Sequence, residues 1–241
     1  MTAVVISQPM LFPWPGFFEQ LMLADVYIYL DDAQFSKGSF TNRIQLKYGN
    51  DIRWMTIPLA GKGSFTKIAD LRASDDSWKA SHRALLRQSL QAAPYLNDAL
   101  VIFDRVYSHA SLCDLLIASI EEPARYLGIG ARRQTAIASK MAVEGRSWQR
   151  VLDMVTHFGG TRYVTGHGAL NYLDHEAFEV SGVVVDYMAY SRTPWAQNGE
   201  TFTPYVSILD LIAHMGPRAA QCLVPATTPW QALLKQETVT S

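Results

Sequence analysis

The sequence has few cysteines, no excess of charge of either sign and no long apolar run. Its two cysteines, Cys113 and Cys222, lie outside any CxxC or Cys/His spacing, which argues against disulfides and zinc and is typical of reduced cytoplasmic thiols. With 21 basic and 22 acidic residues among 241, the chain has no overall field that would attract DNA or an anionic membrane. No run of about 18 apolar residues could span a bilayer. Early prolines interrupt the first apolar run, which therefore does not resemble a signal peptide.

Metal motifs are also missing. The six histidines show no HxH or HExxH spacing, and the carboxylates form no metal signature. No motif indicates a cofactor, so the cofactor stays open. We expect a cytoplasmic protein that binds small molecules.

Short apolar, β-branched runs alternate with helical patterns along most of the chain. The runs typical of buried strands are nearly continuous and cover residues 3–7, 26–30, 135–138, 162–165 and 183–187. Helical patterns cover residues 148–155 and 172–178. This alternation predicts an α/β, Rossmann-like fold, in which a mostly parallel sheet carries helices on both faces.

The middle of the chain differs from this pattern. Residues 77–127 contain no strand signal and carry apolar residues at helical spacing, which predicts a helical subdomain inserted into the sheet domain. Residues 52–57 alternate and predict an edge strand. We expect a single domain over residues 1–230, followed by a tail at 231–241.

Polar residues gather where the predicted strands end. In an open parallel sheet, ligands bind beyond the carboxyl ends of the strands. Gln8 follows the first strand, and residues 31–43 follow the second. Asp31 is a candidate general base, since a carboxylate just past a buried strand is partly desolvated. The candidate binding residues of the same loop are Gln34, Lys37, Asn42 and Arg43. The alternative is a solvated loop in which Asp31 caps a turn.

A third strand end carries Gly166, His167 and Gly168. Backbone N–H groups at such a turn could bind an anion, and His167 is a candidate general acid or base. An ordinary strand-to-helix turn with an exposed histidine would explain the pattern equally well. Lys62, in a loop rich in glycine, could add positive charge to a site.

Four groups of residues, in order along nearly the whole chain, resemble a known family. They are Ile6-Ser7-Gln8-Pro9 with Phe12-Pro13-Trp14 and Gly16; Leu30-Asp31-Asp32-Ala33-Gln34-Phe35 with Lys37, Asn42 and Arg43; Gly166, Gly168, Tyr172 and Leu173; and Pro204, Ser207, Asp210 and Leu211. The combination resembles the WbqC-like family, whose name comes from bacterial surface polysaccharide (O-antigen) gene clusters. The resemblance implies that these positions, Trp14, Gly16 and Tyr172 included, line a substrate site.

The opening strand, turn and helix are also similar, more remotely, to HIGH-type nucleotidyltransferases such as pantothenate synthetase. In those enzymes the turn carries His-x-Gly-His, whose imidazoles hold the phosphates of ATP. Here Trp14-Pro15-Gly16-Phe17 stands at that place, and its aromatic rings cannot donate two hydrogen bonds to a phosphate. The resemblance implies a nucleotidyltransferase-like pocket without ordinary adenylyl transfer. Lys37, Arg43 and Lys62 could replace the histidines electrostatically.

Two functions from different classes follow. The first is a transferase of polysaccharide or related small-molecule biosynthesis, which attaches an acyl or aminoacyl group to an amino sugar. A nucleotide-linked amino sugar and an activated donor would be its substrates, and Asp31 or His167 would accept the amine proton. The second is a non-catalytic protein that binds a nucleotide-sugar in a degenerate pocket. A homodimer stays open, because the many aromatic residues could cover a subunit interface.

Overall fold

The computed structural model describes residues 1–61 and 65–239. Its centre is a six-stranded sheet with the strand order β5-β2-β1-β6-β7-β8. The first five of these are parallel, and β8 pairs antiparallel with β7 at the edge. The bounds are β1 (Ala3–Ser7), β2 (Val26–Tyr29), β5 (Gln134–Ile137), β6 (Arg162–Thr165), β7 (Val184–Met188) and β8 (Thr227–Pro229). The prediction of a Rossmann-like α/β fold is therefore confirmed.

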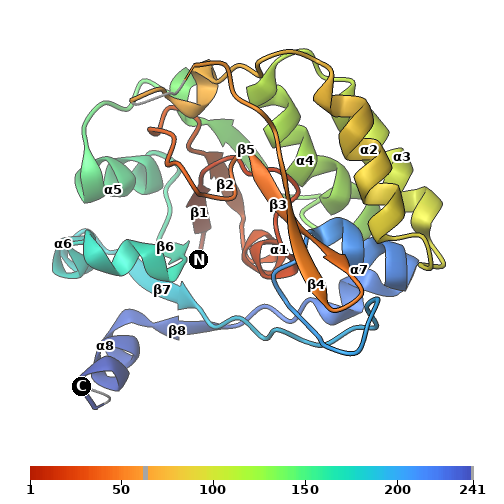
Figure 1. Ribbon diagram of the computed structural model, residues 1–241. Helices are drawn as coiled ribbons and strands as arrows, with labels where there is room; N and C mark the ends of the chain where they lie inside the picture. Colours follow the sequence, from red (N-terminus) through yellow and green to blue (C-terminus); the bar gives the residue numbers. More distant parts are fainter. Residues whose placement is uncertain (62–64, 240–241) are drawn as a thin grey trace.

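Helices cover both faces of the sheet (Figure 1). One face carries α1 (Pro15–Met22), α4 (Leu112–Leu127) and α7 (Ile208–Met215), and the other carries α5 (Ser147–His157), α6 (His175–Val180) and α8 (Trp230–Val239). Neighbouring residues of a strand point to opposite faces, so Val5 packs into the first core and Val4 into the second. Burial on both faces explains why β1, β2, β6 and β7 are nearly continuously apolar, whereas β5, at the edge of the sheet, is more exposed.

Three helices occupy the predicted insertion: α2 (Trp78–Ser89), α3 (Leu96–Tyr107) and α4. Helix α3 packs against α4 and α7. The segment after Trp230, which we expected to be a tail, forms α8 and contacts β7 and β8. In the described part of the chain, no helix is long and apolar enough to cross a membrane.

A separate two-stranded sheet holds the strand predicted at residues 52–57. It is observed as β4 (Asp51–Thr56), which pairs antiparallel with β3 (Arg43–Tyr48) and not with the main sheet. Strand β3 was not predicted, although Ile44, Leu46 and Tyr48 alternate with polar residues as in a half-buried strand. One of those polar residues is Lys47, a residue type that is rarely buried. Lys47 is nevertheless fully buried, and its ammonium donates to Gln197 Oε1 (3.3 Å) and to the Thr201 carbonyl.

The segment between β1 and α1 is bonded to three distant parts of the chain. The Leu11 N–H donates to the carbonyls of Phe40 (3.2 Å) and Thr41 (3.1 Å). Ser119 Oγ on α4 accepts from the Phe12 N–H (3.0 Å), and Ile208 N–H at the start of α7 donates to the Pro13 carbonyl (2.9 Å). These bonds fix the chain that leaves the central strand.

His82, on α2, predicts a pH dependence of stability. Its Nε2 faces the Thr56 carbonyl (3.1 Å), so Nε2 carries the proton and Nδ1 accepts from Tyr107 Oη (2.9 Å). Burial lowers the pKa of His82 to about 4. The unfolded chain binds a second proton at His82 near the ordinary pKa of about 6.5, whereas the folded chain binds it only near pH 4. The contribution of the neutral His82 ring to the free energy of unfolding is therefore complete above pH 6.5 and is lost as the pH falls toward 4.

We therefore expect the unfolding free energy in urea to fall by about 2 kcal/mol from this group between pH 7 and pH 5. In His82→Gln, which keeps a donor and an acceptor without a titrating ring, that part of the fall should disappear. Comparing variant with wild type cancels the other titrating groups, so equal pH slopes for the two proteins would contradict the assignment.

Candidate functional site

The carboxyl edge of the sheet brings several predicted site residues together. From β1 the chain continues to β2 on one side, and from β6 it continues to β7 on the opposite side. The direction in which successive strands are added therefore reverses between β1 and β6, which makes this the switch point of the sheet. The register pairs Val5 with Val164, and Gln8 directly follows β1 while His167 comes two residues after the end of β6. Gly166 and Gly168 flank that histidine.

His167 is held in one orientation by the neighbouring strand. Its Nε2 lies 2.8 Å from the Met188 carbonyl oxygen at the end of β7. A carbonyl only accepts, so Nε2 carries the proton and Nδ1 is left as an acceptor. His167 is exposed and begins the short 3-10 helix η3 (His167–Asn171). A neutral imidazole in this orientation can accept a proton at Nδ1.

Aromatic rings surround this histidine and form what we call the edge cluster: Trp14, His167, Tyr190 and Tyr205. The Tyr190 ring centroid lies 4.7 Å from that of Trp14 and 6.2 Å from that of His167. Trp14 also contacts Tyr205 at 5.4 Å. Burial, together with the charge of Glu19, raises the pKa of Tyr190 to about 12, so its hydroxyl remains a donor at neutral pH.

The chain after β7 is tied to α1 beside this cluster. The buried Glu19 carboxylate accepts from Ser191 Oγ (2.5 Å) and from the Ser191 N–H (3.3 Å). Arg192 follows with a φ of +50° and lies over the Tyr205 ring at 5.7 Å, and Phe12 has a φ of +32°. Strained backbone at non-glycine residues is common at functional sites. Of four such residues in the described chain, Phe12 lies two positions before Trp14 and Arg192 two positions after Tyr190, whereas Phe65 and Ser147 lie elsewhere in the sequence.

Gly16 packs closely against Trp14. A Cβ at Gly16 would lie 2.2 Å from Cη2 and Cζ3 of Trp14. The indole therefore lies against the first turn of α1. Gly166 is similarly close to Tyr190, whose Oη would lie 3.2 Å from an added Cβ, whereas Gly168 faces open space.

Asp31 is buried, and its carboxylate is bonded to the chain after β5. It accepts from the Ser139 N–H (2.9 Å) and from Ser139 Oγ (2.6 Å). The neighbouring Asp32 forms a two-pronged ion pair with Arg150, at 2.6 and 3.1 Å. Both carboxylates thus hold the loop after β2, although the Asp31 oxygens keep further acceptor capacity.

The other residues predicted from the loop after β2 separate into two groups. Lys37, Asn42 and Arg43 line a cavity of about 710 Å³ between this loop and the chain after β4. Asn42 Nδ2 also donates to the Ile57 carbonyl (2.9 Å). Gln34 is exposed, and its backbone bridges to Lys67. Lys62 lies outside the described residues.

Tyr172 lies in a different place from the edge cluster. It lines a shallow depression of about 450 Å³ together with His175 on α6 and Trp230 on α8. His175 stacks on Trp230 at 4.7 Å. The family resemblance implied that Tyr172 belongs to the same site as the glycines at 166 and 168, and the structure gives it separate neighbours.

The structure offers little for covalent or metal chemistry in the described part of the chain. No group of three His, Cys, Asp or Glu side chains in residues 1–61 and 65–239 could hold a metal ion. Burial raises the pKa of the Cys113 thiol to about 11, with Asp31 as the next cause, so it stays protonated at neutral pH. Proton transfer at His167 is the chemistry that the arrangement supports most directly.

Sequence reasoning missed Tyr190, Arg192, Tyr205 and Ser139 as site residues. Tyr190 and Arg192 directly follow β7, so the rule that ligands bind at strand ends could have found them. Tyr205 reaches the edge cluster from the loop before α7, and Ser139 reaches Asp31 from beyond β5. Neither of these two has a local signal in the sequence.

Comparison with known proteins gives a family but no activity. The model described as the WbqC-like protein family matches residues 8–222. A relative from Mycobacterium tuberculosis (strain ATCC 25618 / H37Rv), which is itself uncharacterized, is 28% identical over 228 residues, covering 92% of this chain and 98% of its own. No solved structure matches the chain.

The packing of Trp14 on Gly16 is testable with a pair of glycine variants. Gly16→Ala should displace the indole and lower the unfolding free energy by about 1–3 kcal/mol, because the added methyl overlaps the ring. Gly168→Ala, whose Cβ meets no atom within 4 Å, should change it by less than about 0.5 kcal/mol. The indole N–H resonance of Trp14, assigned with Trp14→Phe, should shift only in Gly16→Ala. Equal effects of the two alanines would show that Trp14 does not occupy this position.

Proposed function

We propose that this chain, which belongs to the WbqC-like family, is a transferase that attaches an acyl or aminoacyl group to an amino sugar or a similar amine. The observation that carries the proposal is the orientation of His167, whose Nε2–H is directed at the Met188 carbonyl and whose Nδ1 is left to accept a proton. This imidazole lies at the switch point of a parallel sheet, which is where α/β folds place their ligands. Both cysteines are free, in keeping with a cytoplasmic enzyme.

In the proposed step, a neutral amine attacks the carbonyl carbon of an activated acyl or aminoacyl donor. The nitrogen lone pair forms the new C–N bond, and the bond between the acyl carbon and its leaving group breaks, so that the leaving group departs with the electron pair. Nδ1 of His167 accepts the proton that the nitrogen loses. General base catalysis of this kind contributes about 10²–10⁴ to a rate.

The edge cluster suits a sugar as the acceptor. The rings of Trp14, Tyr190 and Tyr205 offer apolar faces, and two of them carry hydroxyl groups that can donate to sugar oxygens. Because the pKa of Tyr190 is raised by burial, its hydroxyl does not ionise near neutral pH. Gln8, which directly follows β1, would add an amide with donors and an acceptor.

Lys37 and Arg43 would hold the anionic part of a substrate. Both line the cavity beside the loop after β2, as does Asn42. This cavity and the edge cluster are linked through the chain after β1, because the Leu11 N–H is bonded to Phe40 and Thr41 while Trp14 belongs to the cluster.

Asp31 is the second candidate for the base. Its carboxylate accepts two bonds from Ser139 and retains lone pairs that could accept a third. We favour His167, because it is exposed whereas Asp31 is buried.

The alternative function is a non-catalytic protein that binds a nucleotide-sugar. The cations of the cavity favour it, since they could hold such a ligand without any chemistry at His167. The two functions differ in turnover, which the following experiment measures.

The protein is incubated with UDP- or dTDP-linked amino sugars together with acyl-CoA, aminoacyl-tRNA, or an amino acid with ATP, and the product mass is followed. We expect a new amide product, whose rate of formation His167→Gln lowers at least about 100-fold. His157→Gln, at an exposed histidine on α5, is the matched control and should retain the full rate.

The Asp31→Asn variant separates the two candidate bases. If it loses the product while His167→Gln retains it, the assignment of the base moves to Asp31. If the wild-type protein binds these sugars without turnover with any of the three donors, the transferase proposal fails and the binding function replaces it.

A further inference from the structure

The cavity beside the loop after β2 has an apolar wall that a simple anion would not use. Its volume is about 710 Å³, within the usual range for small-molecule sites. Phe35, Ile57, Leu59 and Leu71 contribute to its lining. Phe35, Ile57 and Leu71 belong to the main hydrophobic core, so this wall is rigidly supported.

Three cations line the same cavity with one carboxylate among them. Lys37, Arg43 and Arg72 are the cations, and Asp70 is the carboxylate. None of the three cations forms an ion pair with any residue in the part of the chain that the structure describes. The lining therefore carries a net charge of about +2, which a ligand with two or more adjacent negative charges would balance.

Arg43 is positioned in advance for such a ligand. Its guanidinium carbon lies 4.1 Å from the centre of the Trp54 ring, and Nη2 donates to the Gly38 carbonyl. Nε of Arg43 is buried and finds no acceptor among the described residues. Because protein atoms cover Nε, a phosphate would accept from the outer Nη groups of this guanidinium, a common pairing for arginine.

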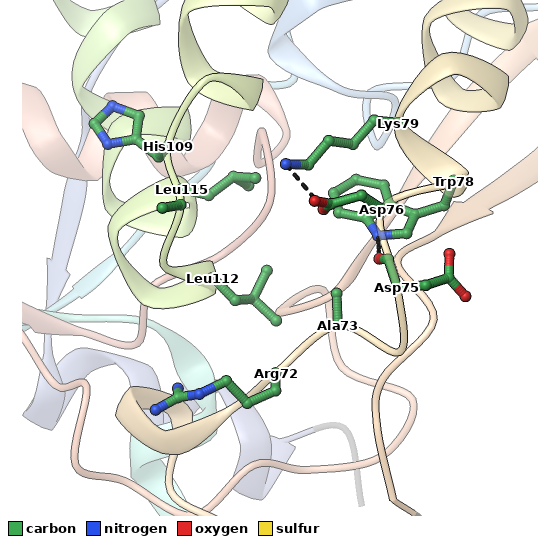
Figure 2. Close-up of a pocket in the computed structure, with 10 residues that line it drawn as sticks. Arg72, Ala73, Asp75, Asp76, Trp78, Lys79, His109, Leu112 and Leu115 are labelled. Atoms are coloured by element: carbon green, nitrogen blue, oxygen red, sulfur yellow. Dashed lines mark hydrogen bonds and ion pairs between the residues drawn. The ribbon is translucent and has the colours of Figure 1, made fainter.

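Arg72 is the cation of this lining that the sequence did not indicate as a site residue. It also borders a smaller depression of about 230 Å³ next to α2, where Asp76 pairs with Lys79 at 3.0 Å. Figure 2 shows the Arg72 guanidinium turned away from that pair. Within the described residues its side chain donates to the Leu71 carbonyl (3.0 Å), which leaves most of its five N–H donors for a ligand.

We propose that this cavity binds a nucleoside diphosphate unit. The diphosphate oxygens accept from Lys37, Arg43 and Arg72, and the nucleoside lies against the apolar wall that includes Phe35 and Leu59. The inference rests on the proposed function and deepens it, because it names the carrier of the amino sugar. It also assigns Arg72 a binding role.

Isothermal titration with UDP, ADP, GDP, CDP and dTDP tests the inference, with inorganic pyrophosphate and uridine as the partial ligands. We expect at least one nucleoside diphosphate to bind with a dissociation constant on the order of micromolar, and both partial ligands to bind at least about tenfold more weakly. Raising the salt concentration should weaken binding of the diphosphate more than that of uridine.

Variants then locate the site. Lys37→Gln, Arg43→Gln and Arg72→Gln should each weaken binding about tenfold or more, as expected when a charged partner of a phosphate is lost. Arg53→Gln is the matched control, because Arg53 lies on the same hairpin, stacks on Tyr48 at 4.7 Å and does not line the cavity. Thermal melting checks that Arg43→Gln still folds. Lys37 is exposed and has no packing role, so its variant keeps the test decisive.

Three results would overturn the inference: no nucleoside diphosphate binds at millimolar concentration, pyrophosphate binds as tightly as the best nucleotide, or the three cavity variants bind like wild type. The fate of the transfer reaction is measured separately. His167→Gln should bind the nucleotide normally, so a protein that binds through the cavity cations but forms no amide refutes the transferase alone. A protein that forms amide without binding any nucleoside diphosphate refutes the cavity assignment alone.

Discussion

The hydrogen bonds of the chain that leaves β1 constrain the rest of the structure. Pro9, Pro13 and Pro15 have no N–H, so the segment has few donors, and those of Leu11 and Phe12 are both used for distant partners. These bonds join the central strand to the loop after β2 and to α4, and the Pro13 carbonyl joins it to α7. A loop that would otherwise be mobile thereby becomes the fixed junction between the sheet, the inserted helices and the cavity.

The junction also leads to Trp14 in the edge cluster, where Arg192 lies over the Tyr205 ring. Trp14, at the end of the fixed segment, covers the first turn of α1 and leaves no room at Gly16 for a phosphate to approach. The backbone there presents an indole and two tyrosines, which suit a sugar ring better than an anion. Lys37, Arg43 and Arg72 line the cavity instead. In the proposed function, the cavity holds the charged part of the substrate and the edge cluster holds the sugar.

Much of the fold could be predicted from the sequence, because its strands have strong local signals. The five parallel strands were recognised from continuous apolar runs, and their boundaries agree with the structure to within one residue. Strand β3 was missed although Ile44, Leu46 and Tyr48 alternate with polar residues, which is itself a strand signal. The sequence did not show that Lys47 would be buried, with its ammonium bonded to the 197–201 loop. The site was predicted in part: strand ends indicated Gln8, His167 and the loop after β2, but not which of their polar groups would already be bonded.

The sequence alone determined the α/β class, the positions of the main strands and the loops that carry polar groups, because these depend on residue type and spacing along the chain. The tertiary structure decided which partners each polar side chain has and how it is oriented. Ser139, 108 positions from Asp31, occupies two acceptor positions on that carboxylate, while the Met188 carbonyl orients His167 from 21 positions away. Arg72 reaches the cavity of Arg43 through the packing of η1 (Ile68–Asp70) against the loop after β2. Such contacts join residues with no local relationship, so they exist only once the chain has folded.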